Sequence, residues 1–129
     1  MTISYLPYYV KGDPDGDTML QLVLAYIEMY CKVTPAVILG GSRTAKHATA
    51  RWLAMWLMRK HYNWTMGDIG IALNRDHSTI SHGLTSFRKL LMNDDQHDYW
   101  STKVFQFKPY IKLQGAWAVD MEGMAGRDM

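Results

Sequence analysis

TMGDIGIALNRDHSTISHGLTSFRKLL, residues 65–91, contains two apolar helical patterns separated by a short polar turn. Thr65 and Asp68 have the spacing of a helix capping box, and Ile69 and Leu73 give the short helix after it an inward face. Asp76 can cap a second helix. The apolar residues of that helix recur at helical steps and are Ile80, Leu84, Phe87 and Leu91. Two helices joined by so tight a turn predict a helix-turn-helix.

The sequence before this stretch predicts three further helices. An amphipathic pattern runs over residues 18–31, with Asp17 or Thr18 as a cap, and a short helical turn is expected over residues 35–39. Residues 44–62 lack proline and glycine and form the longest predicted helix. Its Trp52, Met55, Trp56 and Met58 are expected in the core rather than in a stacking platform for bases. The predicted fold class is all-α.

The chain of 129 residues fits one domain with tails. Proline, glycine and aspartate in residues 1–17 predict an extended arm, and residues 18–100 are expected to form the domain. An acidic segment over residues 94–98 leads into a closing helix near Tyr99 and Trp100. Residues 101–129 form a tail without clear periodicity from about Phe107. Disorder is the commoner state of such a terminus, and a partner-binding role for a replication or transcription protein is the alternative.

Composition excludes several classes of protein. A hydrophobic fraction of 48% with 20% charged residues is ordinary for a globular chain. Cys31 is the only cysteine, so neither an intrachain disulfide nor a thiolate zinc cluster can form. The first residues lack the features of a signal peptide, and no apolar stretch approaches the ~18 residues of a membrane span. We therefore expect the protein in the cytoplasm.

Charge is divided unevenly along the chain. Residues 32–89 hold nine basic and two acidic residues, a net charge of +7, while the remainder holds five basic and ten acidic residues, a net charge of −5. A basic middle between acidic ends is expected of a phosphate-binding surface, although a solvated helix face would give the same pattern.

Residues 69–82, IGIALNRDHSTISH, carry the most specific motif. This string resembles the signature of the C-terminal DNA-binding domain of the bacterial replication initiator DnaA. The core of that signature reads Ile-Gly, a short spacer, Arg-Asp-His-[Ser/Thr]-Thr-Val, one further residue and His. The resemblance extends over residues 20–91 and implies a Trp-repressor-like helical domain that binds the DnaA box.

The first turn of the second helix supplies the residues expected to read bases. Recognition helices present their N-terminal residues to base edges in the major groove, where carboxylates, hydroxyls and imidazoles can contact bases. By resemblance, the base-reading positions or their phosphate-contacting neighbours are Arg75, Asp76, His77, Ser78 and Thr79. The resemblance also implies that Arg43 enters the minor groove. It gives Arg51 and Arg59 as contacts to the DNA backbone, and we expect the nearby Lys46 and Lys60 to join them.

Several of these residues could instead have roles that involve no contact with DNA. Asp76 could only cap the helix, His77 could be an ordinary solvated histidine, and Thr79 could serve packing. His82 is expected to pack or to hydrogen-bond, because it points away from a DNA-facing His77.

Four positions depart from the family pattern and leave the exact DNA site open. Ser81 stands where a branched apolar residue is usual, Ser86 where a charged residue is usual and Gly67 where proline is frequent. Gly83 should cost its helix ~1 kcal/mol relative to alanine.

The sequence lacks features that an enzyme or a full initiator would need. It contains no Gly-x-x-x-x-Gly-Lys-[Ser/Thr] loop, so we expect no ATP binding, no other cofactor and no origin firing by this chain alone. It has no His-Glu-x-x-His metal motif and no serine elbow. A DNA-binding module of this kind could compete at DnaA boxes, regulate transcription at related sites, or tether a partner to an origin. A protein-interaction module that uses a Trp- and Met-rich surface is the alternative of a different class.

Overall fold

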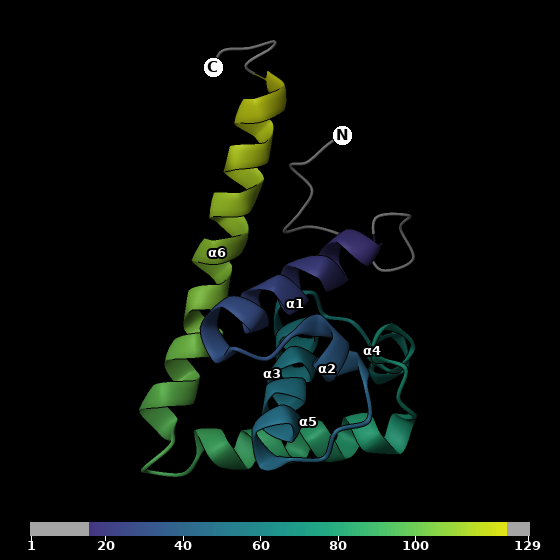
Figure 1. The fold of residues 1–129 in the computed structure, drawn as a ribbon. Helices are drawn as coiled ribbons and strands as arrows, with labels where there is room; N and C mark the ends of the chain where they lie inside the picture. Colours follow the sequence, from purple (N-terminus) through teal and green to yellow (C-terminus); the bar gives the residue numbers. More distant parts are fainter. Residues whose placement is uncertain (1–15, 124–129) are drawn as a thin grey trace.

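A computed structural model of the chain describes residues 16–123, with side chains described for residues 19–110. Within these residues the fold is all-α, as predicted (Figure 1). Its helices are α1 (Gly16–Cys31), α2 (Pro35–Leu39), α3 (Ala45–His61), α4 (Met66–Leu73), α5 (His77–Leu91) and α6 (His97–Gly123). None of these helices is long and apolar enough to cross a membrane.

Local capping chemistry sets the starts of four helices. The cap residues of α2 to α5 all have extended backbone conformations and accept a hydrogen bond from the amide three residues later. They are Thr34, Thr44, Thr65 and Asp76. Thr65 and Asp68 form both hydrogen bonds of the predicted capping box. These helices therefore begin where the sequence predicts.

The first helix begins earlier than expected. Most of the arm predicted for residues 1–17 lies outside the described residues, but α1 already starts at Gly16. Asp17 and Thr18 are therefore inside its first turn rather than before it. The amides of a first helical turn have no partner within the helix and favour an acidic neighbour, so aspartate is compatible with this position.

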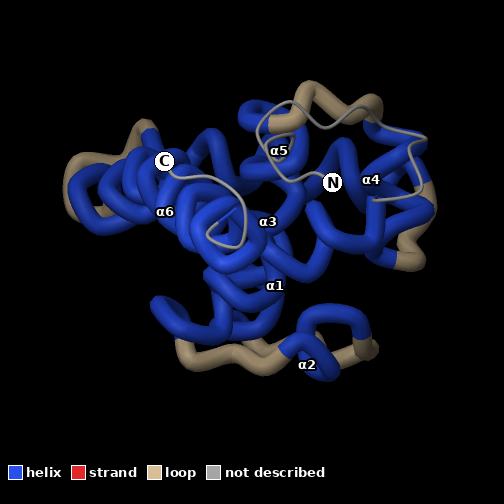
Figure 2. The backbone as a smooth tube through the Cα atoms, turned by 90° about the horizontal axis from the view of Figure 1, so that it is seen from above, coloured by secondary structure: helices blue, strands red, loops and turns tan. Residues whose placement is uncertain are grey.

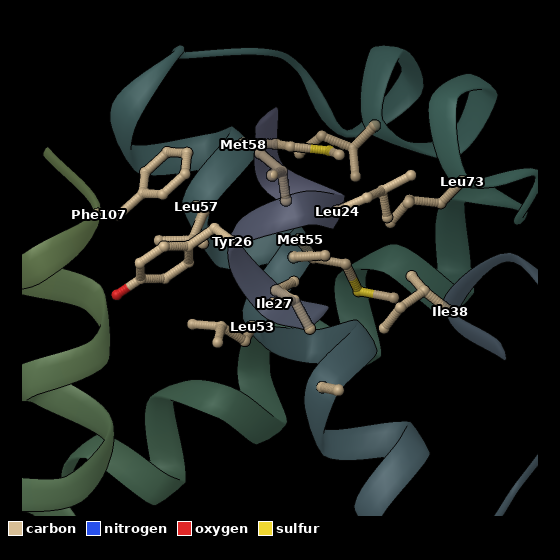
Figure 3. Packing of buried hydrophobic residues seen from close by; sticks show 14 of the residues in the cluster. Leu24, Tyr26, Ile27, Ile38, Leu53, Met55, Leu57, Met58, Leu73 and Phe107 are labelled. Carbon is tan, nitrogen blue, oxygen red and sulfur yellow. The ribbon is translucent and has the colours of Figure 1, made fainter. Parts of the chain in front are cut away.

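The core is built around α3, which contacts each of the other five helices of the described region. Figure 3 shows its buried residues between those of α1, α4 and α6. Met55 and Met58 are buried, and Trp52 and Trp56 pack against the edge of the same cluster. The predicted assignment to the core is therefore confirmed for Met55 and Met58, while Trp52 and Trp56 lie at its edge.

The packed domain continues beyond the boundary predicted at residue 100. Phe107 of α6 is fully buried against the rings of Tyr26 and Tyr62. The Tyr26 hydroxyl also donates a 2.5 Å hydrogen bond to the backbone carbonyl of Lys103. Aromatic packing between residues so distant in sequence leaves no local pattern, which is why the boundary was misplaced.

The backbone of α6 stays helical to Gly123 and projects past the other helices (Figure 1). A view from above shows α6 at one side of α3 and α1, while α2 lies beyond α1 (Figure 2).

Candidate nucleic-acid interface

A close approach of α4 to the following turn sets where α5 begins. Asn74 ends α4 in the left-handed conformation, with φ 57°, and the Arg75 amide donates a 2.8 Å hydrogen bond to the Gly70 carbonyl. A Cβ at Gly70 would lie 2.6 Å from the Arg75 carbonyl oxygen. Only glycine allows this approach, so the Ile-Gly pair of the motif has a steric role.

The first turn of α5 presents polar side chains to solvent. Asp76, His77, Ser78 and Thr79 are all exposed. The Asp76 carboxylate accepts hydrogen bonds from the Thr79 amide at 2.8 Å and from the Ser78 hydroxyl at 3.0 Å. Hydrogen bonds from Thr79, and then from Ser78, hold the pKa of Asp76 below its usual value. Asp76 therefore caps the helix as an ionised carboxylate, on the surface expected to face DNA.

A groove of about 580 Å³ lies beside this turn, between α5, α3 and the basic loop of residues 40–44. Predicted site residues that line it are Arg43, Arg51, Arg75 and Thr79. Ser42, Trp52 and His82 line it too. Arg75 also lines a second hollow of about 360 Å³, together with Asp76 and His77. The structure thus brings Arg43 of the loop and Thr79 of the first turn of α5 to the same groove.

Arg51 corrects one expectation, because it is buried rather than available to a phosphate. Its side chain is 7% exposed, and it is the one charged residue in the buried part of the described side chains. Its guanidinium donates to four backbone carbonyls, at 2.7 Å to Ile38, 2.9 Å to Val37, 3.1 Å to Ser42 and 3.3 Å to Gly40. Burial, and then the charge of Arg75, lower the pKa of Arg51, yet a guanidinium stays ionised at neutral pH. A buried charge needs such partners, so Arg51 organises the chain between α2 and α3.

Arg75 joins this loop to the helix-turn-helix. Its guanidinium donates to the Gly40 carbonyl and, at 3.2 Å, to the carbonyls of Leu73 and Asn74. Gly40 therefore accepts hydrogen bonds from both Arg51 and Arg75. Arg75 remains partly exposed at the groove.

The remaining predicted backbone contacts do not line the groove. Lys46 is exposed beside a separate hollow that Cys31 and Tyr99 line. Arg59 donates a 2.9 Å hydrogen bond to the Trp64 carbonyl, and the Lys60 ammonium lies 5.0 Å from the centre of the Trp56 ring. Both are near the far end of α3, about 20 Å from its start at ~1.5 Å per residue.

One exposed residue and one buried residue have roles that the sequence analysis missed. Ile71 is 83% exposed and lines the hollow beside His77, although its neighbours Ile69 and Leu73 are buried. Helical spacing could have shown this, since a residue midway between two inward positions points outward. Gly83 faces α3 so closely that a Cβ would lie 2.3 Å from Met55 Sδ and 2.9 Å from Trp52 Cδ1. A tertiary contact thus explains a glycine that helix propensity alone disfavours.

Comparisons with known proteins agree with this geometry. Residues 20–86 match the family described as bacterial DnaA protein helix-turn-helix. Similar proteins are the chromosomal replication initiator protein DnaA of Thermomicrobium roseum, 31% identical over 59% of this chain, and that of Lachnoclostridium phytofermentans, 32% identical over 66%. DnaA 2 of Protochlamydia amoebophila is 34% identical over 61% of this chain. The aligned regions cover only 17–19% of these relatives. Over its helix-turn-helix and the helices that pack on it, the chain belongs to the bacterial DnaA helix-turn-helix family.

Proposed function

We propose that this protein binds double-stranded DNA at sites resembling the DnaA box and discriminates among sequences there. Family membership supports DNA binding in general. The observation that carries the sequence-specific part is the exposed first turn of α5, residues 76–79, beside a groove lined by Arg43 and Arg75. The side chains of that turn reach solvent, whereas further along α5 one face, with Ile80, Gly83 and Phe87, is buried where the helix packs on the domain.

Docking follows from the sizes of the two DNA grooves. The major groove, about 12 Å wide, admits the first turn of α5, and the narrower minor groove admits a single arginine side chain. With His77 and Ser78 in the major groove and Arg43 in the adjacent minor groove, one sugar-phosphate strand passes between them. In this docking, the groove lined by Arg43, Arg75 and Thr79 would face that strand, and its arginines would offer cations to the phosphates.

The physiological role we propose is regulation of replication or transcription rather than complete initiation. The chain spans less than a fifth of the length of the DnaA relatives it matches, and the part in common is the helix-turn-helix region rather than the rest of those proteins. Occupation of a DnaA-box-like site by this module would compete with a full initiator or block a promoter.

An interaction module built on the Trp and Met residues of α3 is less well supported. Met55 and Met58 are buried in the core, and Trp52 and Trp56 are partly covered by the packing of α3 on α5. The surface that this alternative requires is therefore largely used in folding.

Selection from a random DNA library, followed by anisotropy titrations on the selected and on scrambled duplexes, tests the proposal. Thr79→Ala should weaken binding to the selected duplex, because Thr79 lines the groove. Thr85→Ala is the matched control, since it is the same change at another exposed position of α5. If no sequence is enriched, or if both variants bind equally well, α5 is not the reading helix.

A further inference from the structure

The basic loop is held to the rest of the domain by hydrogen bonds and not by a hydrophobic contact of its own. The Ser42 hydroxyl lies 2.6 Å from His47 Nδ1 of α3, and the larger set of hydrogen bonds comes from the guanidinium groups of Arg51 and Arg75. Gly41, Arg43 and Thr44 are exposed, and Gly40 and Ser42 are only partly buried. Glycines at 40 and 41 give the backbone here unusual freedom, because glycine loses more conformational entropy on ordering than other residues. Some other interaction must therefore restrict this loop.

Arg51 of α3 restricts the loop through hydrogen bonds to its backbone. Its four carbonyl acceptors lie on both sides of the turn that leaves α2, at Val37, Ile38, Gly40 and Ser42. A guanidinium fork is planar and presents five donors in fixed directions, so it can bind such a set together. A lysine ammonium is a point charge on a flexible stem and cannot reproduce this arrangement.

Arg75 ties the restricted loop to the reading helix. Its guanidinium reaches the Gly40 carbonyl as well as the two carbonyls of the turn before α5. The path from Arg51 through Gly40 to Arg75 thus connects the loop that carries Arg43 with the start of α5. Arg43 itself is exposed at the rim of the same groove.

We propose that Arg51 is a positioning residue which, with Arg75, fixes the distance between Arg43 and the first turn of α5. Arg51 would thereby determine how far apart the minor-groove and major-groove contacts fall on the DNA. The proposal rests on the proposed DNA-binding function. Arg51 acts through the loop and makes no phosphate contact, in contrast to the role expected from the sequence.

The first test concerns the free protein and needs no DNA. Backbone ¹⁵N relaxation should give order parameters near the rigid value of about 0.85 for residues 41–43 in the wild type. In Arg51→Lys, which keeps the charge and most of the stem, they should fall below about 0.6. Lys60→Met, another change at a cation of α3, should leave them unchanged. Unaltered loop order in a folded Arg51→Lys protein would overturn the proposal, as would a loop that is already mobile in the wild type.

The second test is a double-mutant cycle on the selected DNA site, with A·T or G·C pairs in the flank next to the box. Arg51→Lys should lose flank discrimination by the same factor as Arg43→Ala, and the double variant should lose no more than Arg43→Ala alone, within about twofold. The slope of log affinity against log salt should stay at its wild-type value. Additive losses in this cycle would show that Arg51 touches DNA itself, as would a salt slope for the charge-removing Arg51→Met that falls by about 0.9 more than the slope for Arg43→Ala.

The two tests separate this inference from the proposed function. If the wild type shows no sequence preference, the proposed function fails, and the relaxation experiment still decides whether Arg51 orders the loop. If the wild type selects a site but Arg51→Lys retains loop order and flank discrimination, only the inference fails. Arg51→Met provides a further comparison that removes the charge, with thermal unfolding confirming that each variant is folded.

Discussion

Replacement of Gly70 by alanine tests whether the approach of α4 to the α4–α5 turn positions the reading helix. The added Cβ would lie 2.6 Å from the Arg75 carbonyl oxygen, whereas ordinary contacts begin at 3.4 Å. The turn would have to move by about 0.8 Å to restore that contact. Because the obstacle is a backbone atom, no side-chain rotation can remove it. The movement would displace Arg75 and the cap of α5.

The size of the effect follows from two opposing terms. Alanine in place of glycine favours a helix by ~1 kcal/mol, and forcing extra volume into a packed site costs about 1–3 kcal/mol. Gly67→Ala in the same helix should gain helix propensity without the cost of overpacking, since the nearest atom to its Cβ would be Thr65 Oγ1 at 3.7 Å. Gly70→Ala should therefore be less stable than Gly67→Ala by about 1–3 kcal/mol.

Urea denaturation of both variants and the wild type measures this difference. It should also appear as a lower melting temperature of Gly70→Ala, by about 4–8 °C for each kcal/mol in a domain of this size. On DNA, Gly70→Ala should lose more affinity for the selected site than for scrambled DNA, because the reading residues move and the surface charge stays. Equal stability of the two alanine variants, with equal binding, would refute the steric role assigned to Gly70.

Three further changes probe the interface. His77→Ala should cost about 1–3 kcal/mol on the selected site and little on random DNA, and equal losses on both would contradict base reading. The pKa of Asp76 is depressed in the folded state, so its stabilisation is present above the unfolded pKa and is lost as pH falls through the folded one. Unfolding midpoints of wild type and Asp76→Asn should converge on acidification, and parallel pH curves would argue against this. Ile71 is exposed beside His77, so we expect its side chain to contact the methyl group of one thymine of the site. Replacing that thymine with deoxyuridine, which lacks the methyl group, should weaken binding of the wild type but not of Ile71→Ala. If the replacement weakens binding of both proteins by the same factor at every thymine, Ile71 does not contact a methyl group.

Much of the fold could be predicted because its signals are local. Thr65, Asp68 and Asp76 satisfy amides three residues or fewer away, so their spacing in the sequence is their spacing in the structure. The inward faces of α4 and α5 follow from the helical period, and Ile69, Leu73 and Ile80 are all buried. The string from Arg75 to Thr79 also identified the family, because few helix-turn-helix proteins share its polar residues.

Other features depend on contacts between distant segments. A basic residue on α3 has the same local sequence signature whether it faces solvent or the chain between α2 and α3. Only the packing of α2 shows that Arg51 is enclosed by four carbonyls while Lys60 stays exposed. The same holds for Phe107, which is buried because Tyr26 and Tyr62 lie opposite.

The sequence by itself determined the all-α class and the helix starts at Thr44, Thr65 and Asp76, since each depends on neighbours within a few residues. The tertiary structure alone decided which cations are free to meet DNA and which hold the protein together. It also showed what accompanies the glycine at position 83, because a Cβ there would force the side chains of Met55 and Trp52 of another helix to shift. The physical reason is that burial and steric exclusion depend on what lies across the core, and a one-dimensional pattern does not contain that information.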